Sequence, residues 1–379
     1  LVYPQKYGKP DPNARGMTGP KNAKGETTWG GLANEVCHWG EWVLKKVKAE
    51  IGDLYPLIPD PQYKGNRLAV QDKLWQSSDE ERIPPGYLVP VAYLWTRTVR
   101  CKNPTCGATV PLVRQTWLCK KKDRYVALRM IAPKGEKQVR FEVVESHTEK
   151  GLGFDPAAFS KGGNATCPFC GTVADSDYVK AEGCAKRIGQ QMMAIVCTRP
   201  GKQGKVYLSV EQALEATGGT PVIPPEEEIH KRIEALCRKS GLTVPSEPIE
   251  ARMTGGICLP YGLTNFGTLF TPRQMLCLLT FAAAVREAYQ TMVGQAAGLS
   301  GIGELPVPPV HFTSPIDKAK AKAACSVLAL ICSRLADWNS ALTRWFSQGE
   351  SNLNTFGRQA LPMVWDFAET NSAARQAGS

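Results

Sequence analysis

Two pairs of closely spaced cysteines constrain this chain more than any other feature of its sequence. Cys101 and Cys106 lie in "RCKNPTCGATVPL", and Cys167 and Cys170 lie in "GNATCPFCGTV". A glycine directly follows the second cysteine of each pair, and a strand-like run precedes each pair. Such a knuckle wraps one side of a zinc ion, and a closed tetrahedral site needs four ligands. The two pairs together predict a zinc ribbon with four sulfur ligands.

The separation of the two pairs is unusual for a simple ribbon, because sixty residues lie between Cys106 and Cys167. We therefore expect one or two inserted β-hairpins in "LCKKKDRYVALRMIAPKGEKQVRFEVV". The alternatives are unrelated cysteines in two loops, or a redox pair; the latter is disfavoured because the motif does not open a helix after a strand. A zinc ion with four sulfur ligands has no open position, so its role would be structural. Cys119 and Cys184 lie nearby but are not expected to be ligands.

The remaining cysteines argue against a secreted disulfide framework. The chain has 379 residues and thirteen cysteines, and most of these stand alone in apolar or helical text. An odd total without a secretory signal indicates a reducing compartment, so we expect a cytoplasmic protein. No apolar run reaches the roughly 18 residues that a membrane span needs, so no membrane partner is expected. The chain begins with Leu1, and we interpret it as a piece of a longer or processed polypeptide.

The positive charge of the chain is concentrated around the first cysteine pair. The formal net charge is +11, and the segment 97–150 has thirteen Lys or Arg against five Asp or Glu. Concentrated positive charge suits a polyanion such as DNA, although a solvated basic face is an equally good interpretation. Trp95 and Trp117 are interleaved with these residues; core packing is favoured for them over base stacking. The predicted DNA-binding residues are Arg97, Arg100, Lys102, Arg114, Lys120, Lys121, Lys122 and Arg124.

The hydrophobic pattern divides the chain into three segments. Residues 1–90 contain a Gly- and Pro-rich loop followed by a helix in "NEVCHWGEWVLKKVKAEIGDLYP". Residues 91–208 alternate or are β-branched, which predicts a β-rich module. Residues 209–379 are largely helical, with helix starts marked by Ser209, Thr271 and Ser314.

The sequence contains none of the common catalytic or cofactor-binding motifs. The chain contains no HExxH, no GxSxG and no Walker loop, and "KGLGFDP" and "SGIGELP" are not dinucleotide-binding loops. The string "PPGY" at 84–87 follows Ile83, where an amino-methyltransferase would carry Asp, Asn or Ser. The sequence therefore predicts no catalytic and no cofactor-binding residues within this chain.

An ordered series of motifs nevertheless resembles one enzyme family. The strings "YPQKYG", "HWGEWVLKKVKAEIGDLYP", "AYLWTRTVRCKNPTCGATVPLVRQTWL", "GNATCPFCG", "TRPGKQGKVY", "YGLTNFGTLFTPRQ" and "NTFGRQALPMVWDFAE" are similar to the zinc-ribbon-containing adenine-specific DNA methyltransferases. The resemblance runs, with gaps, from residue 3 to about residue 370. In that family the cofactor loop lies upstream of the first motif, and the catalytic Asp-Pro-Pro-Tyr motif lies downstream of the last.

The resemblance implies a fold, an activity and partners. It implies an α/β protein in which part of a Rossmann-like methyltransferase domain, chiefly its helical shell, carries the β-rich zinc-ribbon insertion. It implies methyl transfer from S-adenosylmethionine to the exocyclic amine of adenine in DNA, with the rest of the methyltransferase polypeptide as partner. This chain alone is expected to be inactive. The alternatives are a free-standing zinc-ribbon nucleic-acid-binding protein, and an interaction module in which zinc only stabilises the fold.

Overall fold

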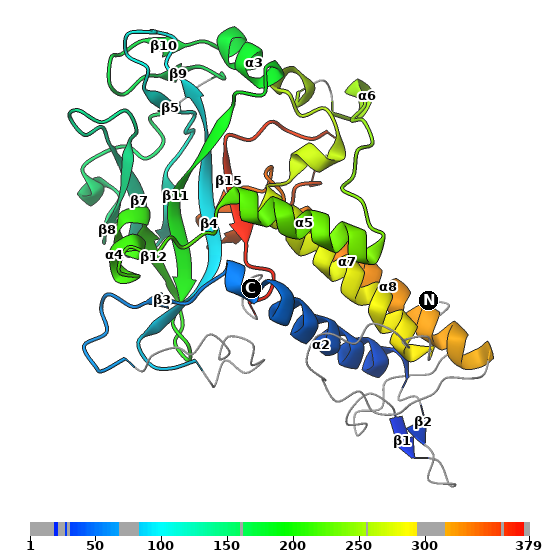
Figure 1. Cartoon of the computed structure of the whole chain (residues 1–379). Helices are drawn as coiled ribbons and strands as arrows, with labels where there is room; N and C mark the ends of the chain where they lie inside the picture. Colours follow the sequence, from blue (N-terminus) through cyan, green and yellow to red (C-terminus); the bar gives the residue numbers. More distant parts are fainter. Residues whose placement is uncertain are drawn as a thin grey trace.

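One long strand, β4 (Tyr87–Arg100), is the axis of the computed structural model (Figure 1). The structure describes residues 19–21, 27–28, 31–67, 83–159, 162–254, 257–293, 315–357 and 360–374. Nearly every residue of β4 is buried, because other elements cover both of its faces. Alternate side chains of a strand point to opposite faces. Tyr93 accordingly packs into the core on the helical side, and Leu94 packs into the core on the other side.

The central sheet is antiparallel throughout. Its strand order is β12-β11-β4-β15, with β3 and β5 also paired to β4. The bounds of these strands are β3 Ile58–Pro59, β5 Thr109–Pro111, β11 Gly189–Thr198, β12 Lys205–Ser209 and β15 Asp366–Thr370. A Rossmann-like sheet is parallel. No parallel strand pair occurs among the described residues, so the expected Rossmann-like part is not found there, and the observed class is mixed α/β with antiparallel sheets.

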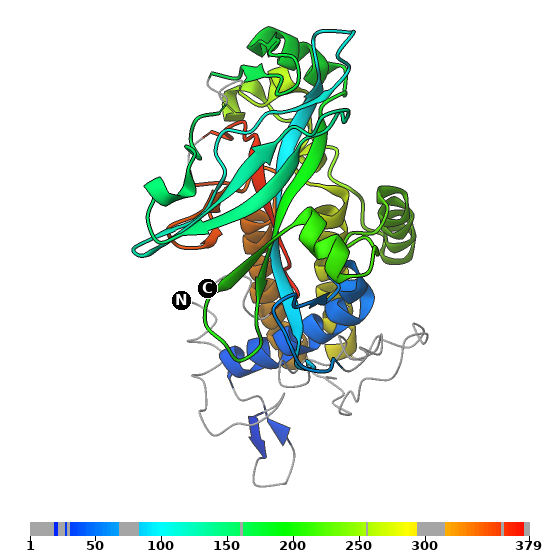
Figure 2. The ribbon, with the colours of Figure 1, turned by 90° about the vertical axis from the view of Figure 1, so that its left-hand side faces the viewer.

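A layer of helices covers one face of the central sheet, and a smaller sheet covers the other (Figure 1). Helices α2, α7 and α8 pack on one another, and α5 packs on α7. Their bounds are α2 Leu32–Ile51, α5 Glu226–Ser240, α7 Pro272–Met292 and α8 Pro315–Trp338. Figure 2 shows the smaller sheet crossing the central sheet obliquely, and its strands are β6 Trp117–Lys121, β7 Arg124–Ile131 and β8 Arg140–Ser146.

The helix signals of the sequence are confirmed where the structure describes them. Ser209 and Thr271 each accept a backbone N–H at the start of a helix, and a glutamine three residues later completes a capping box. The apolar face of α2 is buried, as its spacing predicts, from Trp39 to Ile51. Ser314, the predicted cap of the last long helix, lies outside the described residues, as does most of the N-terminal loop.

Short elements complete the described chain. The remaining helices are α3 Ser176–Cys184, α4 Val210–Ala216 and α6 Ala251–Thr254, and 3-10 turns lie at Gly52–Leu54, Lys150–Leu152, Leu259–Tyr261 and Phe266–Leu269. The remaining strands form the hairpins β1 Gly19–Lys21 with β2 Thr27–Thr28, β9 Ala165–Thr166 with β10 Val173–Ala174, and β13 Trp345–Phe346 with β14 Ser351–Asn352.

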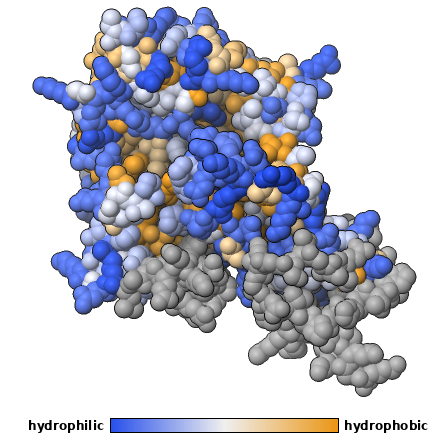
Figure 3. Space-filling model, viewed as in Figure 1, coloured by the Kyte–Doolittle hydropathy of each residue, from blue (hydrophilic) through white to orange (hydrophobic). Residues whose placement is uncertain are grey.

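The central sheet takes strands from all three segments of the predicted domain division. Strand β3 lies within residues 1–90, β5 and β11 lie within residues 91–208, and β15 lies within residues 209–379, whereas β4 and β12 cross the two boundaries between these segments. The central sheet therefore joins all three segments, and their division into separate domains stays a prediction. Hydrophilic residues predominate on the face shown in Figure 3, with hydrophobic patches between them. None of the described helices combines the length and the apolarity that crossing a bilayer requires.

Candidate metal centre and basic surface

Four cysteine sulfurs converge at the end of β4 that lies far from the helical layer. The ligand atoms of Cys101, Cys106, Cys167 and Cys170 all lie within 4.8 Å of one another. The Sγ atoms of Cys101 and Cys170 are 3.5 Å apart, and those of Cys106 and Cys167 are 3.8 Å apart. The structure thus brings together all four residues that the sequence predicts as ligands.

The first pair lies on a tight turn between β4 and β5. The Cys101 amide donates to the carbonyl of Ala108 at 2.8 Å, and the Cys106 amide donates to the carbonyl of Asn103 at 3.1 Å. Gly107 has a φ of 59°, in the left-handed region that glycine enters without steric cost. The Asn103 amide hydrogen-bonds the Cys101 sulfur, so backbone amides point at the thiol as expected for a knuckle.

The second pair lies at the tip of the β9–β10 hairpin. The Cys167 amide donates to the carbonyl of Thr172 at 2.8 Å, and the Gly171 amide donates to the carbonyl of Cys167 at 2.9 Å. Gly171 has a φ of 75°, so both knuckles use a left-handed glycine directly after the second cysteine. The amides of Phe169 and Cys170 hydrogen-bond the Cys167 sulfur. The two cysteine pairs therefore share a backbone geometry as well as a sequence pattern.

The environments of the four thiols differ. Burial raises the pKa of Cys101 to about 12 and also raises the pKa of Cys167. Hydrogen bonds from the Thr172 side chain and backbone lower the pKa of Cys170 to about 6, and this cysteine is exposed. Metal ligation requires thiolates, so a metal ion would displace protons from the buried thiols when it binds.

The sulfur positions fit a tetrahedral site. Zn–S bonds of about 2.3 Å in tetrahedral geometry place sulfur atoms about 3.8 Å apart. The two shorter separations, 3.5 and 3.8 Å, are close to this value and far longer than a disulfide bond, which measures about 2.05 Å. Soft thiolate ligands in a closed set of four favour zinc or an iron–sulfur centre over hard cations such as magnesium.

The knuckles are tied into the protein by packing as well as by the cysteines. Three of the cysteines belong to a hydrophobic cluster with Val99, Val110 and Val179. Helix α3 closes this cluster from the side, and Asp175, its N-cap, accepts the Tyr178 amide at 2.9 Å. The cluster is small, and a metal ion would therefore add a large share of its stability.

Two further cysteines were set aside as ligands, and the structure places both outside the cluster. Cys119 is buried in β6 and its thiol donates to the carbonyl of Arg124 at 3.6 Å. Cys184 is exposed at the end of α3, and its thiol donates to the carbonyl of Pro260 at 3.4 Å. The inserted hairpins between the knuckles are confirmed as the sheet β6-β7-β8.

Arg97 does not belong to a basic surface, which corrects its prediction as a DNA contact. Its guanidinium donates to the carbonyls of Val364 and Ala341, both at 3.0 Å, and lies 5.5 Å from the ring centroid of Phe367. Burial lowers the pKa of Arg97 to about 10. These hydrogen bonds join β4 to the C-terminal segment.

Several of the other predicted DNA contacts are paired with acids. Lys120 pairs with Glu149 at 3.0 Å, and Arg124 pairs with Glu145 at 2.9 Å. Lys121 pairs with Glu350, which is 6% exposed. These pairs neutralise part of the local surplus, which the sequence count could not show.

The remaining predicted contacts stay close to the surface. Arg100 is exposed and donates to the carbonyl of Gly107 at 3.1 Å. Lys102 pairs with Asp175 beside the first knuckle. Arg114 and Lys122 are exposed. The basic residues near the knuckles remain predicted DNA contacts.

Trp95 and Trp117 pack into the core, which confirms the prediction that the sequence favoured over base stacking. Trp117 is 8% exposed, and its ring lies 6.4 Å from that of Tyr125. The Trp95 ring stacks on Phe367 at 6.3 Å, and its Nε1 donates to Glu369 at 3.1 Å.

One set of candidate functional residues escaped the sequence analysis altogether. A pocket of about 620 Å³ lies between the three-stranded sheet and the C-terminal segment, and Arg344, Trp345 and Asp366 line it. Asp366 belongs to "VWDFAE", a string that was read only as a family motif. Trp345 and Trp365 were the available signal, although no residue period connects them to the β-rich module.

Comparisons with protein-family models, with curated proteins and with solved structures found no match to this chain. The family resemblance therefore depends on the sequence motifs alone.

Proposed function

We propose that this chain supplies the zinc-bound DNA-recognition region of an adenine-specific DNA methyltransferase. The observation that carries the metal part of the proposal is the convergence of four cysteine sulfurs within 4.8 Å. The ordered motifs of the sequence carry the enzymatic part. Zinc would be held by all four sulfurs, leaving no open position for water or substrate, so it would act by fixing a zinc ribbon.

The proposed reaction assigns the chain a supporting role. S-adenosylmethionine would donate its methyl group to the exocyclic amine of adenine, which must leave the duplex to be reached. The cofactor and catalytic motifs of the family are expected in other parts of the polypeptide, which is the proposed partner of this chain. The chain would orient DNA through phosphate contacts, which position a protein without reading sequence.

The position of the knuckles supports a DNA-facing role. Arg100 and Lys102 lie directly beside Cys101, and a metal ion at the cysteines would hold their backbone in place. Rigid placement matters because a phosphate contact is lost when its side chain is carried on a mobile loop. Lys122, at the turn between β6 and β7, extends the same charge along the module.

The alternative is a free-standing zinc-ribbon nucleic-acid-binding protein. It requires the same cysteine centre and the same basic side chains but no methyl transfer. A third candidate, an interaction module without nucleic-acid binding, is favoured by the ion pairs of Lys120, Lys121 and Arg124, which leave less free charge than the sequence suggests.

The natural reading frame that contains this chain provides the test. Its full product is incubated with duplex DNA and S-adenosylmethionine, and the nucleosides are then analysed by mass spectrometry for methylated adenine. We expect methyladenine with the full product and none with residues 1–379 alone. DNA binding by the full product without any methylation would favour the free-standing binding protein, and no DNA binding at all would favour the interaction module.

A further inference from the structure

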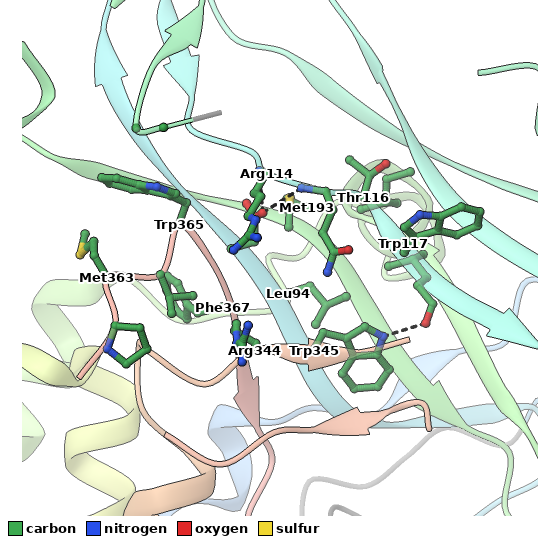
Figure 4. A pocket seen from close by; sticks show the side chains of 18 residues that line it. Leu94, Arg114, Thr116, Trp117, Met193, Arg344, Trp345, Met363, Trp365 and Phe367 are labelled. Carbon is green, nitrogen blue, oxygen red and sulfur yellow. Dashed lines mark hydrogen bonds between the residues drawn. The ribbon is translucent and has the colours of Figure 1, made fainter. Parts of the chain in front are cut away.

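An aromatic pocket whose lining includes two unpaired arginines lies between the β-rich module and the C-terminal segment. Its volume is about 620 Å³, within the range of pockets that hold small organic ligands. Its walls come from the chain after β5, strand β6 and the C-terminal residues from Arg344 to Phe367, and Leu94, Leu128, Gly162, Gly163 and Met193 complete the lining. Figure 4 shows the side chains that the argument uses, namely Arg114, Trp117, Arg344, Trp345, Trp365 and Phe367.

The aromatic walls of the pocket are held in place by contacts outside it. The Trp345 Nε1 donates to the carbonyl of Leu118 at 2.7 Å. The Trp365 ring meets Tyr261 edge to face at 4.9 Å, and Phe367 is 1% exposed. Trp345 and Trp365 are half-buried, so part of each ring remains open to a ligand. Rings fixed in this way bind a flat partner with little loss of conformational entropy.

The two arginines of the pocket differ from the other basic side chains of the module. Arg114 and Arg344 are exposed, and within the described part of the chain neither guanidinium has a hydrogen-bond or ion-pair partner. Lys120, Lys121 and Arg124, in contrast, are paired with acids. Guanidinium groups bind phosphate through two parallel hydrogen bonds, which makes unpaired arginines in a pocket suited to a phosphate-bearing ligand.

The acid that lines the pocket is committed to the protein itself. Oδ2 of Asp366 accepts the backbone N–H of Arg114 at 2.7 Å and that of Gln115 at 3.2 Å. Its Oδ1 is shielded from solvent and has no hydrogen bond of ordinary geometry; the nearby Thr96 hydroxyl donates to the Arg97 carbonyl at 3.3 Å. Asp366 thus holds the corner that carries Arg114, and does not present an anion to the ligand.

A second hollow continues the first. Its volume is about 330 Å³, and it shares Gln115, Trp117, Arg344 and Trp345 with the larger pocket. It adds Lys120, whose Nζ lies 4.7 Å from the ring centroid of Trp117. The two hollows form one trough with cations along it, which suits a chain of linked phosphates better than an isolated small molecule.

We propose that this trough binds unpaired nucleotides of a DNA strand, with bases against the Trp345 and Trp365 rings and phosphates at Arg114 and Arg344. Stacking on aromatic rings combined with basic contacts to the backbone is the general mode of single-strand binding. The proposal deepens the proposed function and rests on it for the class of ligand. A strand opened beside a displaced base would supply such nucleotides, and a free nucleoside monophosphate offers the same chemistry.

The test measures the binding of a short fluorescein-labelled oligothymidylate by fluorescence anisotropy. Arg344→Ala should weaken binding roughly tenfold, since it removes charge-assisted hydrogen bonds to a phosphate. Arg344→Lys should recover part of the affinity. Arg238→Ala, which removes an exposed arginine of α5, is the matched control and should leave affinity unchanged. An abasic oligomer should bind at least about fivefold more weakly, because it cannot stack.

Parallel measurements separate this inference from the proposed function. Unchanged affinity in Arg344→Ala, or equal affinity for the abasic oligomer, would overturn the proposal that the trough binds a DNA strand. Duplex binding without single-strand binding would overturn the trough and leave the proposed function standing. If thymidine monophosphate competes as strongly as the oligomer, the pocket binds a free nucleotide, and the proposal that it binds a DNA strand is overturned. Circular dichroism melting checks that each variant is folded.

Discussion

At the scale of single residues, the cysteine centre shows how much depends on side chains brought together by folding. Cys101, Cys106 and Cys167 are buried, and Cys170 faces solvent. Burial raises the pKa of the Cys101 and Cys167 thiols, so a metal ion must compete with protons for these two ligands. The centre should therefore bind metal more weakly as pH falls, because protons then compete better for the sulfurs.

The first prediction concerns the metal. We expect one zinc ion per purified chain, and Cys106→Ser should lower the zinc content and destabilise the β-rich module by several kcal/mol. Plasma mass spectrometry measures the zinc, and guanidinium unfolding measures the stability. Cys184→Ser changes an exposed cysteine outside the cluster and is the control. Full zinc retention in the Cys167→Ser Cys170→Ser double variant would show that these two cysteines are not zinc ligands.

The second prediction concerns Asp366. Burial raises the pKa of its carboxyl group from the ordinary value of 3.8 to about 7. The folded state then holds a proton that the unfolded state has lost, so the free energy of unfolding falls as pH rises from about 4 through 7. Asp366→Asn keeps an acceptor for the two backbone amides and removes this ionisation. Its stability relative to the parent should therefore grow by roughly 2–3 kcal/mol between pH 5 and pH 8.

Urea unfolding at the two pH values measures this difference. Asp155→Asn is the matched control, because that exposed carboxylate also accepts a backbone amide, from Ala157 at 2.8 Å. A stability difference between Asp366→Asn and the parent that stays constant with pH would contradict the raised pKa.

At the scale of secondary-structure elements, one buried ion pair connects the helical layer to the sheet. Arg273 of α7 is 2% exposed and pairs with Glu369 of β15, which is 1% exposed. The guanidinium also donates to the carbonyl of Leu54 at 3.0 Å and lies 4.0 Å from the ring centroid of Tyr93. The pair thus fixes the position of α7 against two other elements.

The third prediction follows from the cost of a buried unpaired charge. Glu369→Gln leaves the Arg273 guanidinium without its counter-ion and should destabilise the protein by roughly 3–5 kcal/mol. The double variant Arg273→Met Glu369→Gln should be less destabilised than the Glu369→Gln single variant, since no charge then remains in the core. Thermal and urea unfolding of the parent, the two single variants Arg273→Met and Glu369→Gln, and the double variant give the coupling energy. Equal stability of the single variant and the parent would mean that the pair does not hold α7.

At the scale of the whole molecule, the charge of +11 is distributed less freely than the sequence count suggests. Ion pairs of the β6-β7-β8 sheet neutralise part of the positive charge, and the Arg97 guanidinium donates hydrogen bonds to backbone carbonyls. The exposed cations near the knuckles remain the proposed DNA contacts of the module. Any DNA affinity should then be modest and strongly dependent on salt.

The fourth prediction concerns this salt dependence. The chain should bind duplex DNA weakly, and Lys122→Glu should lower the slope of log affinity against log salt by about one. Changing Lys122 alone leaves intact the ion pairs of Lys120 and Lys121, whose reversal would place like charges together. Lys239→Glu, at an exposed position on α5, is the control and should keep the slope. An unchanged slope in the Lys122 variant would show that this charge only solvates the hairpin.

The sequence by itself determined the local features of this protein. Paired cysteines with a following glycine predicted both knuckles, and cap residues such as Thr271 predicted where helices start, because these signals act over a few residues. Alternating text also predicted the strands between the knuckles.

Only the tertiary structure decided what depends on contacts between distant residues. The tertiary structure decided that the strands of the central sheet pair antiparallel, since strand pairing follows from long-range packing and not from the residues of one strand. The pairing of β15 with β4 brought Asp366 to the corner at Arg114 and buried Arg97 under the C-terminal carbonyls. More than 240 residues separate these partners in the chain. No local pattern of charge or hydrophobicity encodes contacts over that distance, because they form only when the cores that join these segments have assembled.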